Sequence, residues 1–562
     1  MRNKRIAFAL LGAAALAGCT TGSRESIASR PVAPGRPNII LITAEDMSPR
    51  LGVFGDPVAV TPNIDRLASE GITFTRAFTT AGVCAPSRSA LITGVHQQSL
   101  GTMHMRTSMF GRDMAEGAPY EAVTPPEVKA FPELLRRAGY YAVNDVKTDY
   151  QFGTPFSVWD QVRDGADWNE RAPGQPFFLM INHEVTHEGW TWMPGTDPAA
   201  HPTAAKTVAR NVALHAKLGF APTDPAKVRV PPYYPDTPKV RADIAWYYDN
   251  IRVMDRQVGE LLDRLRAEGR FDDSIIIFMT DHGDGLPRGK RTIFDSGTHV
   301  PLIVRFPDRR GAGTKRGDLV SAIDLAPTVL GWAKAPVPRW IQGRDLFGDP
   351  APQAVFMGGD RFDEVPQRFR GIREARYHYI RYFSDKPVIP ALAYQNVNPI
   401  MQEWRRLFAE GRLTPLQRSY LDAPPPREML FDTATDPDEV VNLADDPEFA
   451  VIKRRLSARL DRWIVESGDM GREPESRMVE RMWPNGAQPV TASVTACRVA
   501  NGKTRLTSAT PGASIGWGGP KGEQHLYVAP LAATSAFVSA AVRYGYRASD
   551  PVTIDPAKLD RC

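Results

Sequence analysis

Continuous apolar runs alternate with amphipathic segments over the first 350 residues of the chain. The runs NIILIT (38–43), PFFLMIN (176–182) and SIIIFMT (274–280) show no regular polar alternation, which is typical of strands buried on both faces of a parallel sheet. Between Asp249 and Ala267 the apolar residues form one helical stripe that ends at Gly269: Ile251, Met254, Val258, Leu261, Leu262 and Leu265. The pattern predicts an α/β domain whose mostly parallel sheet carries helices on both faces.

The pattern changes twice toward the C-terminus. After residue 350 come shorter strands, as in GIREARYHYIRYF, and one helix, EFAVIKRRLSARLDRWI, which indicate a smaller α+β portion. From Pro484 onward, short alternating runs are separated by Gly, Pro and Asn turns, which predicts a β-sandwich of about 80 residues. We therefore expect a large α/β domain over 37–350, a smaller α+β subdomain over 351–483 and an accessory β-domain over 484–562.

The N-terminus has the organisation of an export signal. A basic start is followed by an apolar run too short to span a membrane, and then by Leu-Ala-Gly-Cys19. The cysteine resembles that of a bacterial lipoprotein box, although an ordinary signal peptide with an incidental cysteine is the alternative. We expect a signal peptide over 1–18, a lipidated Cys19, a Ser/Pro/Gly/Ala-rich tether over 19–36, and a location at the cell envelope, either periplasm or outer membrane.

Composition is that of a folded protein, with 42% apolar and 24% charged residues among 562. Loss of Arg2, Lys4 and Arg5 with the signal lowers the formal charge from +5 to +2. A charge this small gives no electrostatic footprint for nucleic acid, so we expect no nucleic-acid partner, and membrane contact only through the lipid anchor.

Acidic residues follow two of the predicted strands. Glu45 and Asp46 come directly after the first run, and Asp281 and His282 come after SIIIFMT. Carboxylates at adjacent strand ends repel one another unless a cation lies between them. Their oxygens favour Ca²⁺ or Mg²⁺, although an Asp-His pair alone also suits zinc, and each pair alone could be a helix cap or a solvated loop.

Two further residues stand out by their position. His187 follows PFFLMIN within His-Glu-Val-Thr-His and is interpreted as an acid/base group or anion ligand, with a structural histidine as the alternative. Cys84 precedes a short predicted helix that has Pro86 in its first turn and Gly94 at its end. A helix N-terminus favours an anionic substrate, so Cys84 is either a nucleophile there or an inert buried cysteine. The two C-terminal cysteines, Cys497 and Cys562, could pair in an exported chain.

The segment Cys84-Ala85-Pro86-Ser87-Arg88, followed by Leu-Ile-Thr-Gly94, resembles the signature of type I sulfatases of the alkaline phosphatase superfamily. In that family the cysteine is converted to Cα-formylglycine. The resemblance continues in family order through RPNIILITAEDM, TPNIDRLASEG, LRRAGYY, PFFLMIN, YYDNIRVMDRQVGELLDRL, MTDHGD, GKRTIFDSGTHVPLIVRFP, VSAIDLAPTVL and LFDTATDPDEVVNLA. It implies an alkaline-phosphatase-like mixed, mostly parallel sheet.

The resemblance also implies roles at matching positions. Ca²⁺, in preference to Mg²⁺, would be held by an oxygen of modified Cys84 together with Glu45, Asp46, Asp281 and His282. Arg88 would fix the formylglycine hydrate. The groups that would bind the sulfate oxygens and help protonate the leaving oxygen are Lys147, His187 and Lys290.

Three positions depart from the family pattern. Glu45 stands where aspartate is usual, which lengthens one metal-binding arm, and Thr186 replaces the usual proline. Asp149 stands where the common Gly-Lys-x-His pattern has histidine. The Lys147–Tyr150 stretch resembles that of bacterial sulfatases similar to heparan N-sulfatases.

The resemblance implies a sulfatase acting on O- or N-sulfates of sulfated carbohydrates. Its partners would be that substrate and a formylglycine-generating or anaerobic sulfatase-maturating enzyme. The alternatives are a phosphonate monoester or phosphodiester hydrolase of the same superfamily, and a lipoprotein that binds glycans without turnover. Four tryptophans near the predicted site, Trp159, Trp168, Trp190 and Trp192, could stack on sugars or belong to the core, and no role is assigned to them.

Overall fold

The computed structural model describes residues 35–105, 107, 119–519 and 525–562. The predicted signal peptide, Cys19 and all but the last two residues of the predicted tether lie outside the described residues. Within the described part of the chain, no helix is both long and apolar enough to cross a bilayer.

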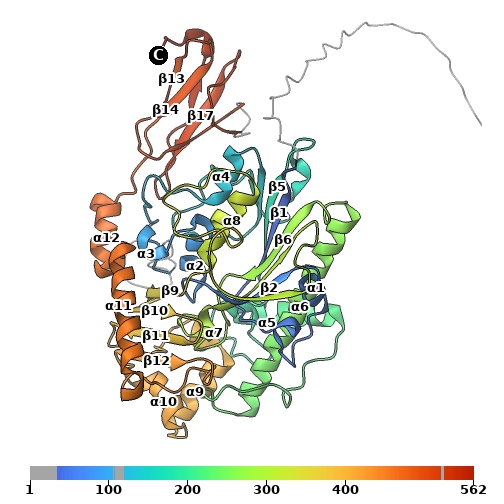
Figure 1. Ribbon diagram of the computed structural model, residues 1–562, viewed down its shortest axis with the longest axis vertical. Helices are drawn as coiled ribbons and strands as arrows, with labels where there is room; N and C mark the ends of the chain where they lie inside the picture. The colour runs from blue at the N-terminus through green and yellow to red at the C-terminus, as the bar shows by residue number, and fades with distance from the viewer. Residues whose placement is uncertain (1–34, 106, 108–118, 520–524) are drawn as a thin grey trace, which may run out of the picture. The chain divides into compact units, whose positions relative to one another are not determined.

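An eight-stranded sheet organises the larger part of the molecule (Figure 1). The strand order is β4-β3-β5-β1-β6-β7-β2-β8, and β7 is antiparallel to both its neighbours while the other pairs are parallel. The strands are β1 (Asn38–Ala44), β2 (Ile72–Phe78), β3 (Tyr141–Asp145), β4 (Gln161–Val162), β5 (Phe177–His183), β6 (Ser274–Thr280), β7 (His299–Arg305) and β8 (Thr314–Ser321). The mixed, mostly parallel sheet is therefore confirmed.

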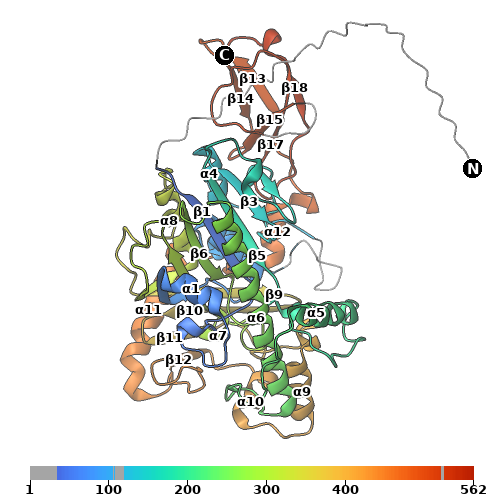
Figure 2. The same ribbon diagram turned by 90° about the vertical axis from the view of Figure 1, so that its right-hand side faces the viewer.

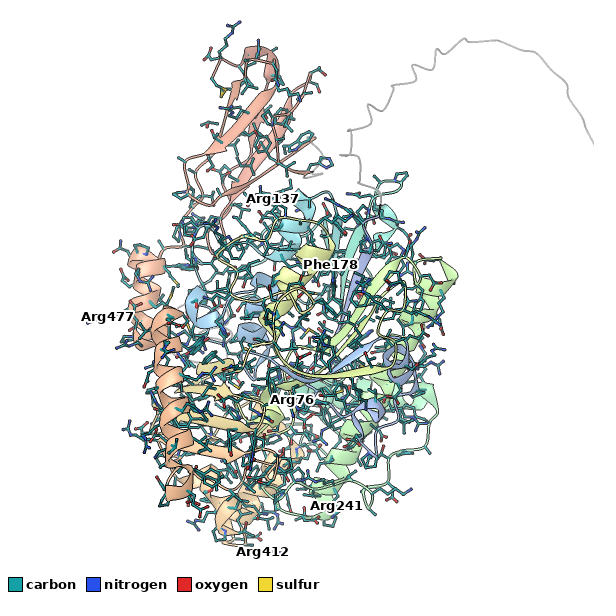
Figure 3. All side chains as sticks on the ribbon, in the orientation of Figure 1. Arg76, Arg137, Phe178, Arg241, Arg412 and Arg477 are labelled. Atoms are coloured by element: carbon teal, nitrogen blue, oxygen red, sulfur yellow. A yellow bond between two sulfur atoms is a disulfide. The ribbon has the colours of Figure 1, made fainter. Side chains whose placement is uncertain are left out.

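The central strands are apolar throughout because both sheet faces are covered. Alternate residues of β1 enter different cores: Ile40 and Ile42 pack with α1 (Pro62–Ser69) and α6 (Pro238–Ala267), which Figure 2 shows near the sheet. On the opposite face Ile39 and Leu41 belong to a core shared with α2 (Cys84–Thr93), α4 (Phe131–Arg137) and α8 (Leu325–Trp332). Phe178, labelled in Figure 3, lies in this second core with its ring 5.1 Å from that of Phe131.

Helix α6 begins eleven residues before the predicted start at Asp249. The Thr237 hydroxyl caps it by accepting from the Val240 amide (3.3 Å), and Pro238 occupies its first turn. The added turns pack against the C-terminal subdomain, where buried Asp243 accepts from the Ile400 amide (3.1 Å). The apolar stripe from residue 251 onward identifies only the part that faces the main sheet.

A second, antiparallel sheet in the order β12-β11-β10-β9 follows, covered by α11 (Ala450–Glu466), which runs beside it in Figure 1. One side of this sheet extends the main core, since Met357 and Ile380 share a cluster with Ile40. Its strands are β9 (Val355–Phe362), β10 (Val365–Arg373), β11 (Tyr377–Tyr382) and β12 (Glu428–Asp432). The other helices are α3 (Gln97–Leu100), α5 (Ala204–Leu218), α7 (Asp295–Thr298), α9 (Pro399–Ala409), α10 (Pro415–Asp422) and α12 (Glu475–Met482).

Two small antiparallel sheets form the C-terminal part. They share one apolar core, as a sandwich does, and the Cys497–Cys562 disulfide (S–S 2.07 Å) joins β13 to the last residue. The strands are β13 (Val494–Arg498), β14 (Thr504–Ser508), β15 (Ser514–Gly518), β16 (His525–Leu526), β17 (Phe537–Val542) and β18 (Val552–Ile554). The boundaries at residues 350 and 483 stay predictions.

Candidate functional site

The carboxyl ends of β1, β5 and β6 form the floor of the candidate site. These strands are neighbours in parallel register, with Ala44 opposite both His183 and Thr280. Residues that follow the three strands must therefore meet at one sheet edge, where open α/β sheets bind ligands. The nine residues predicted to act in the site all lie there: Glu45, Asp46, Cys84, Arg88, Lys147, His187, Asp281, His282 and Lys290.

Cys84 is the first residue of α2 and is completely buried. Its Sγ lies 3.4 Å from His282 Nε2 and 3.7 Å from Asp46 Oδ1. The Ser87 hydroxyl donates to the Asp281 carbonyl and so ties the first turn of α2 to the end of β6. The start of the helix thus directs residue 84 into the acidic cluster, with the positive end of the helix dipole behind it.

Arg88 lies one turn further along α2 and connects the two acidic strand ends. Its guanidinium donates to Glu45 Oε1, to Asp281 Oδ2 (3.1 Å) and to Asn182 Oδ1 (2.8 Å), and its side chain is fully buried. Burial opposes the charge, but Glu45 and Asp281 raise the pKa of Arg88 above its usual range. Arg88 is therefore a permanent cation at the base of the site.

Glu45 accepts from two cations, Arg88 through Oε1 and Lys147 through Oε2. Burial raises the pKa of Glu45 to about 6, partly offset by Arg88 and Lys147. For Lys147, the charges of Cys84 and Glu45 outweigh burial and raise its pKa well above the usual value. The longer side chain at position 45 thus reaches between two cations.

Asp46, like Glu45, is a carboxylate that contacts several charged groups of the site. Its Oδ2 accepts from Lys290 Nζ (2.6 Å) and from the Glu188 amide (2.8 Å), and its Oδ1 lies 2.8 Å from His282 Nε2. Despite burial, Lys290, His187 and His282 hold the pKa of Asp46 well below its usual range. His187 Nε2 lies 3.3 Å from Lys290 Nζ, which binds Asp46, while His187 Nδ1 accepts from the Gly189 amide (3.2 Å).

The acid–histidine pair after β6 is also strongly polarised. Asp281 Oδ1 accepts from the amides of Asp46 and His282, both at 3.0 Å. Burial lowers the pKa of His282, but Asp281, Asp46 and Cys84 outweigh it and raise this pKa to about 10. A strongly negative field therefore surrounds the His282 ring.

The donor set fits a hard divalent cation. One ligand atom from each of Asp46, Cys84, Asp281 and His282 lies within 4.8 Å of the others, and Glu45, Asp46, Cys84 and His187 form an overlapping group. Two of the four residues in each group are carboxylates, whose oxygens are the ligands that hard cations prefer. An oxygen in place of the Cys84 sulfur would make the set harder still.

Two of the three family departures have a clear structural setting. The Thr186 hydroxyl, where proline is usual, donates to the Glu45 carbonyl (2.5 Å) and so holds the β5 loop against β1. Asp149 is half-buried in a left-handed backbone conformation (φ 56°), and its charge reaches Arg88 and Lys147. Asp149 therefore adds negative field where the family pattern has histidine.

Four residues of the hydrogen-bond network around the site were not identified from the sequence. Asn182 orients Arg88, and Arg291 donates to Glu188 (2.9 Å) and to Asp363 beside Lys290. Asn182 could have been noticed as a polar residue ending an apolar strand. The other three could not be recognised from the sequence, because only the packing of the second sheet, where Asp363 follows β9, brings them together.

Three of the four tryptophans belong to the core. Trp159, Trp168 and Trp192 are at most 4% exposed, so they cannot stack on a substrate. Trp190 is half-buried in η4 (Glu188–Trp190), the 3₁₀ turn that follows His187.

Comparison with known proteins agrees with this geometry. The family model "Sulfatase" matches residues 37–161 and 144–335, and the model "N-sulphoglucosamine sulphohydrolase, C-terminal" matches residues 288–400. An ulvan-active sulfatase of Formosa agariphila is 36% identical over 94% of this chain and 92% of its own. Human N-sulphoglucosamine sulphohydrolase is 26% identical over 77% of this chain and 90% of its own.

Solved structures share the fold. A protein in complex with its substrate D-glucosamine-2-N,6-O-disulfate superposes with a TM-score of 0.54 at 17% identity, covering 79% of this chain and 100% of its own. A phosphonate monoester hydrolase of Agrobacterium radiobacter gives 0.51 at 20% identity, covering 77% and 96%. The architecture is therefore common to more than one kind of esterase.

Proposed function

The chain belongs to the sulfatase family of the alkaline phosphatase superfamily, and from that premise we propose that it hydrolyses sulfate esters or N-sulfates of sulfated carbohydrates with residue 84 as the nucleophile. The observation that carries the proposal is the position of Cys84, buried at a helix N-terminus among three carboxylates and three cations. A sulfate monoester is an anion, so its hydrolysis needs such charge neutralisation.

The proposed nucleophile is Cα-formylglycine made from Cys84. As a hydrate, this group supplies one hydroxyl for attack and a second whose deprotonation releases the sulfate. Arg88 supports the proposal because its fixed charge, one helical turn from residue 84, favours the ionised form of a hydroxyl at that position.

We assign the metal to Ca²⁺, held by Glu45, Asp46, Asp281, His282 and the oxygen of modified residue 84. When bound, the ion supplies Lewis acidity to that oxygen. The ion would also compete with Arg88, Lys147 and Lys290 for the carboxylates, which frees part of the cationic charge for sulfate.

We assign binding of the sulfate oxygens and protonation of the leaving oxygen to three residues. Lys147 and Lys290 contact different carboxylates of the cluster, Glu45 and Asp46 respectively, and would hold the sulfate oxygens. His187 Nε2 lies 3.3 Å from Lys290 Nζ, so the two groups would bind the sulfate together and help protonate the leaving oxygen, with the ammonium of Lys290 as a source of the proton.

Sulfated glycans are the proposed substrate class because the relatives above act on ulvan or N-sulphoglucosamine, as their names state. The predicted export signal agrees with this assignment, since a lipidated Cys19 would tether the enzyme at the bacterial cell envelope, where it would meet polysaccharide fragments. Conversion of Cys84 requires a formylglycine-generating or anaerobic maturating enzyme as a partner.

Parallel rate measurements test the proposed reaction. We expect kcat/KM for 4-nitrophenyl sulfate to exceed that for an aryl phosphonate monoester by at least about tenfold, after maturation in a converting host. The reverse order would favour the phosphonate hydrolase whose fold this chain shares. Binding of sulfated glycan with no sulfate release would instead favour a non-catalytic lipoprotein.

A further inference from the structure

A cation stacked on Trp190 stands next to the proposed acid His187 and has no part in the chemistry described above. The guanidinium carbon of Arg210, on α5, lies 3.2 Å from the centroid of the Trp190 ring. Arg210 is exposed, and Trp190 is half-buried. The pair therefore presents a flat, charged surface to solvent.

This pair is tied rigidly to the catalytic loop. The Trp190 amide donates to the His187 carbonyl (2.7 Å), and the Trp190 carbonyl accepts from Asn211 (2.6 Å) and Asn250 (2.8 Å). At the other end of η4, the Glu188 amide donates to Asp46 (2.8 Å). One short turn thus spans from the metal-binding carboxylate to the ring that supports Arg210.

Arg210 lacks a close counterion. Among the residues that the structure describes, it forms no ion pair, and the carboxylate of Glu184 acts on it only from a greater distance. Burial lowers the pKa of Arg210, and the charge of Glu184 does not restore it. A guanidinium in this state gains most from a bound anion, since planar oxyanions accept its paired N–H groups.

Tyr394 borders the same surface from the C-terminal subdomain. Its hydroxyl lies so close to Gly189 that a Cβ there would collide with it. The Tyr394 ring packs against buried Trp192, with the ring centroids 5.2 Å apart and the ring planes tilted by 48°. Aromatic side chains therefore bound the turn that carries His187.

We propose that Arg210, stacked on Trp190, is a subsite for an anionic group on the sugar next to the one that loses its sulfate. The group is a carboxylate of a uronic acid, which is planar, or a second sulfate, which is tetrahedral; either presents two oxygens to the paired N–H groups of a guanidinium. This inference rests on the proposed sulfatase function and names the substrate class in more detail: glycans with an acidic residue beside the scissile sulfate.

Three matched disaccharides test the subsite, carrying the same scissile sulfate next to a uronate, a sulfated sugar or a neutral sugar. We expect Arg210→Ala to lower the ratio of kcat/KM for an acidic over the neutral substrate by at least about tenfold, the size of one charge-assisted hydrogen bond. The acidic substrate that shows the loss identifies the anion. Added salt should lower the same ratio in the wild type.

Arg252→Ala is the matched control. Arg252 also lies over an aromatic ring, that of Phe220 at 4.4 Å, but it donates to the Ala221 carbonyl and is not attached to the His187 turn. The ratio should stay within twofold of wild type in this variant. An unchanged ratio in Arg210→Ala, or an equal fall in Arg252→Ala, would overturn the subsite.

Binding separates this proposal from the proposed function. If the wild type releases no sulfate from any substrate, the sulfatase function fails, and calorimetry with a desulfated uronate disaccharide then tests the subsite alone. Binding by the wild type that weakens at least about tenfold in Arg210→Ala supports it. Equal binding by both proteins overturns it.

Discussion

Glu45 shows what one methylene more than aspartate does in this site. Its carboxylate accepts from Arg88 and Lys147 at once, and all three groups are buried or nearly so. A buried cation that loses its partner is costly, because desolvation is no longer compensated. Glutamate at this position is therefore matched to the positions of both cations.

We predict that Glu45→Asp lowers kcat/KM by about tenfold and lowers the thermal midpoint, since the shorter arm cannot reach both cations. Steady-state kinetics and thermal unfolding measure the two effects. Glu260→Asp is the control, because the Arg256–Glu260 pair is an exposed helical pair whose loss changes little. Wild-type kinetics and stability in Glu45→Asp would contradict this role.

At the scale of elements, the sequence predicted the strands that are buried on both faces of the main sheet. β1, β5 and β6 are buried on both faces, so their uninterrupted apolar runs identified them and placed Glu45, Asp46 and Asp281 at one edge. The first turns of α6 were not predicted because they pack against the C-terminal subdomain rather than the main sheet. Glu188 and Arg291 escaped because their pairing joins segments about 100 residues apart.

The C-terminal sandwich attaches to α4 through one buried carboxylate. Glu133 accepts from the hydroxyls of Ser514 (2.6 Å) and Tyr544 (2.9 Å) and from Arg137 (2.9 Å), the last labelled in Figure 3. Although burial opposes ionisation, Lys129, Arg137 and hydroxyl donors lower the pKa of Glu133 to about 2. The accessory strands are thus bonded to the helix layer of the main sheet.

We predict a pH-dependent loss of stability from this contact. The folded pKa of about 2 lies below the reference value of 4.5, so the stabilisation is present above pH 4.5 and disappears as the pH falls toward 2. The shift corresponds to about 3 kcal/mol at neutral pH. Glu133→Gln should lower the unfolding midpoint at pH 7 and flatten its acid slope.

Thermal unfolding between pH 7 and pH 3 measures both effects, with exposed Glu127→Gln as the control. An unchanged midpoint at pH 7 in Glu133→Gln would contradict the role of this carboxylate.

At the scale of the whole molecule, the structure combines the sheet that carries the site with a C-terminal accessory domain, and the sequence predicts a lipid anchor ahead of them. The Cys497–Cys562 disulfide closes the accessory domain, which is compatible with an oxidising compartment outside the cytoplasm. Cys84 is the free cysteine of the described residues and is buried. Of the four cysteines, two form the disulfide, and the proposed roles of the others are lipid attachment for Cys19 and formylglycine formation for Cys84.

We predict that Cys19→Ser moves the protein from the membrane fraction to the soluble extract of a bacterial host and abolishes incorporation of a labelled fatty acid. Thr20→Ser, next to the lipidation site, should keep both properties. Fractionation and lipid labelling measure the change. A membrane-bound Cys19→Ser protein, or an unlabelled wild type, would contradict the lipid anchor.

The most direct test of the account is the chemical state of residue 84. Mass spectrometry of the tryptic peptide AFTTAGVCAPSR, residues 77–88, should be made on protein from a host that converts such cysteines. We predict a mass about 18 Da below that of the cysteine peptide, the difference between cysteine and formylglycine. An unmodified thiol from that host would contradict an aldehyde-derived nucleophile and leave Cys84 as a buried thiol in a glycan-binding or thiol-dependent protein.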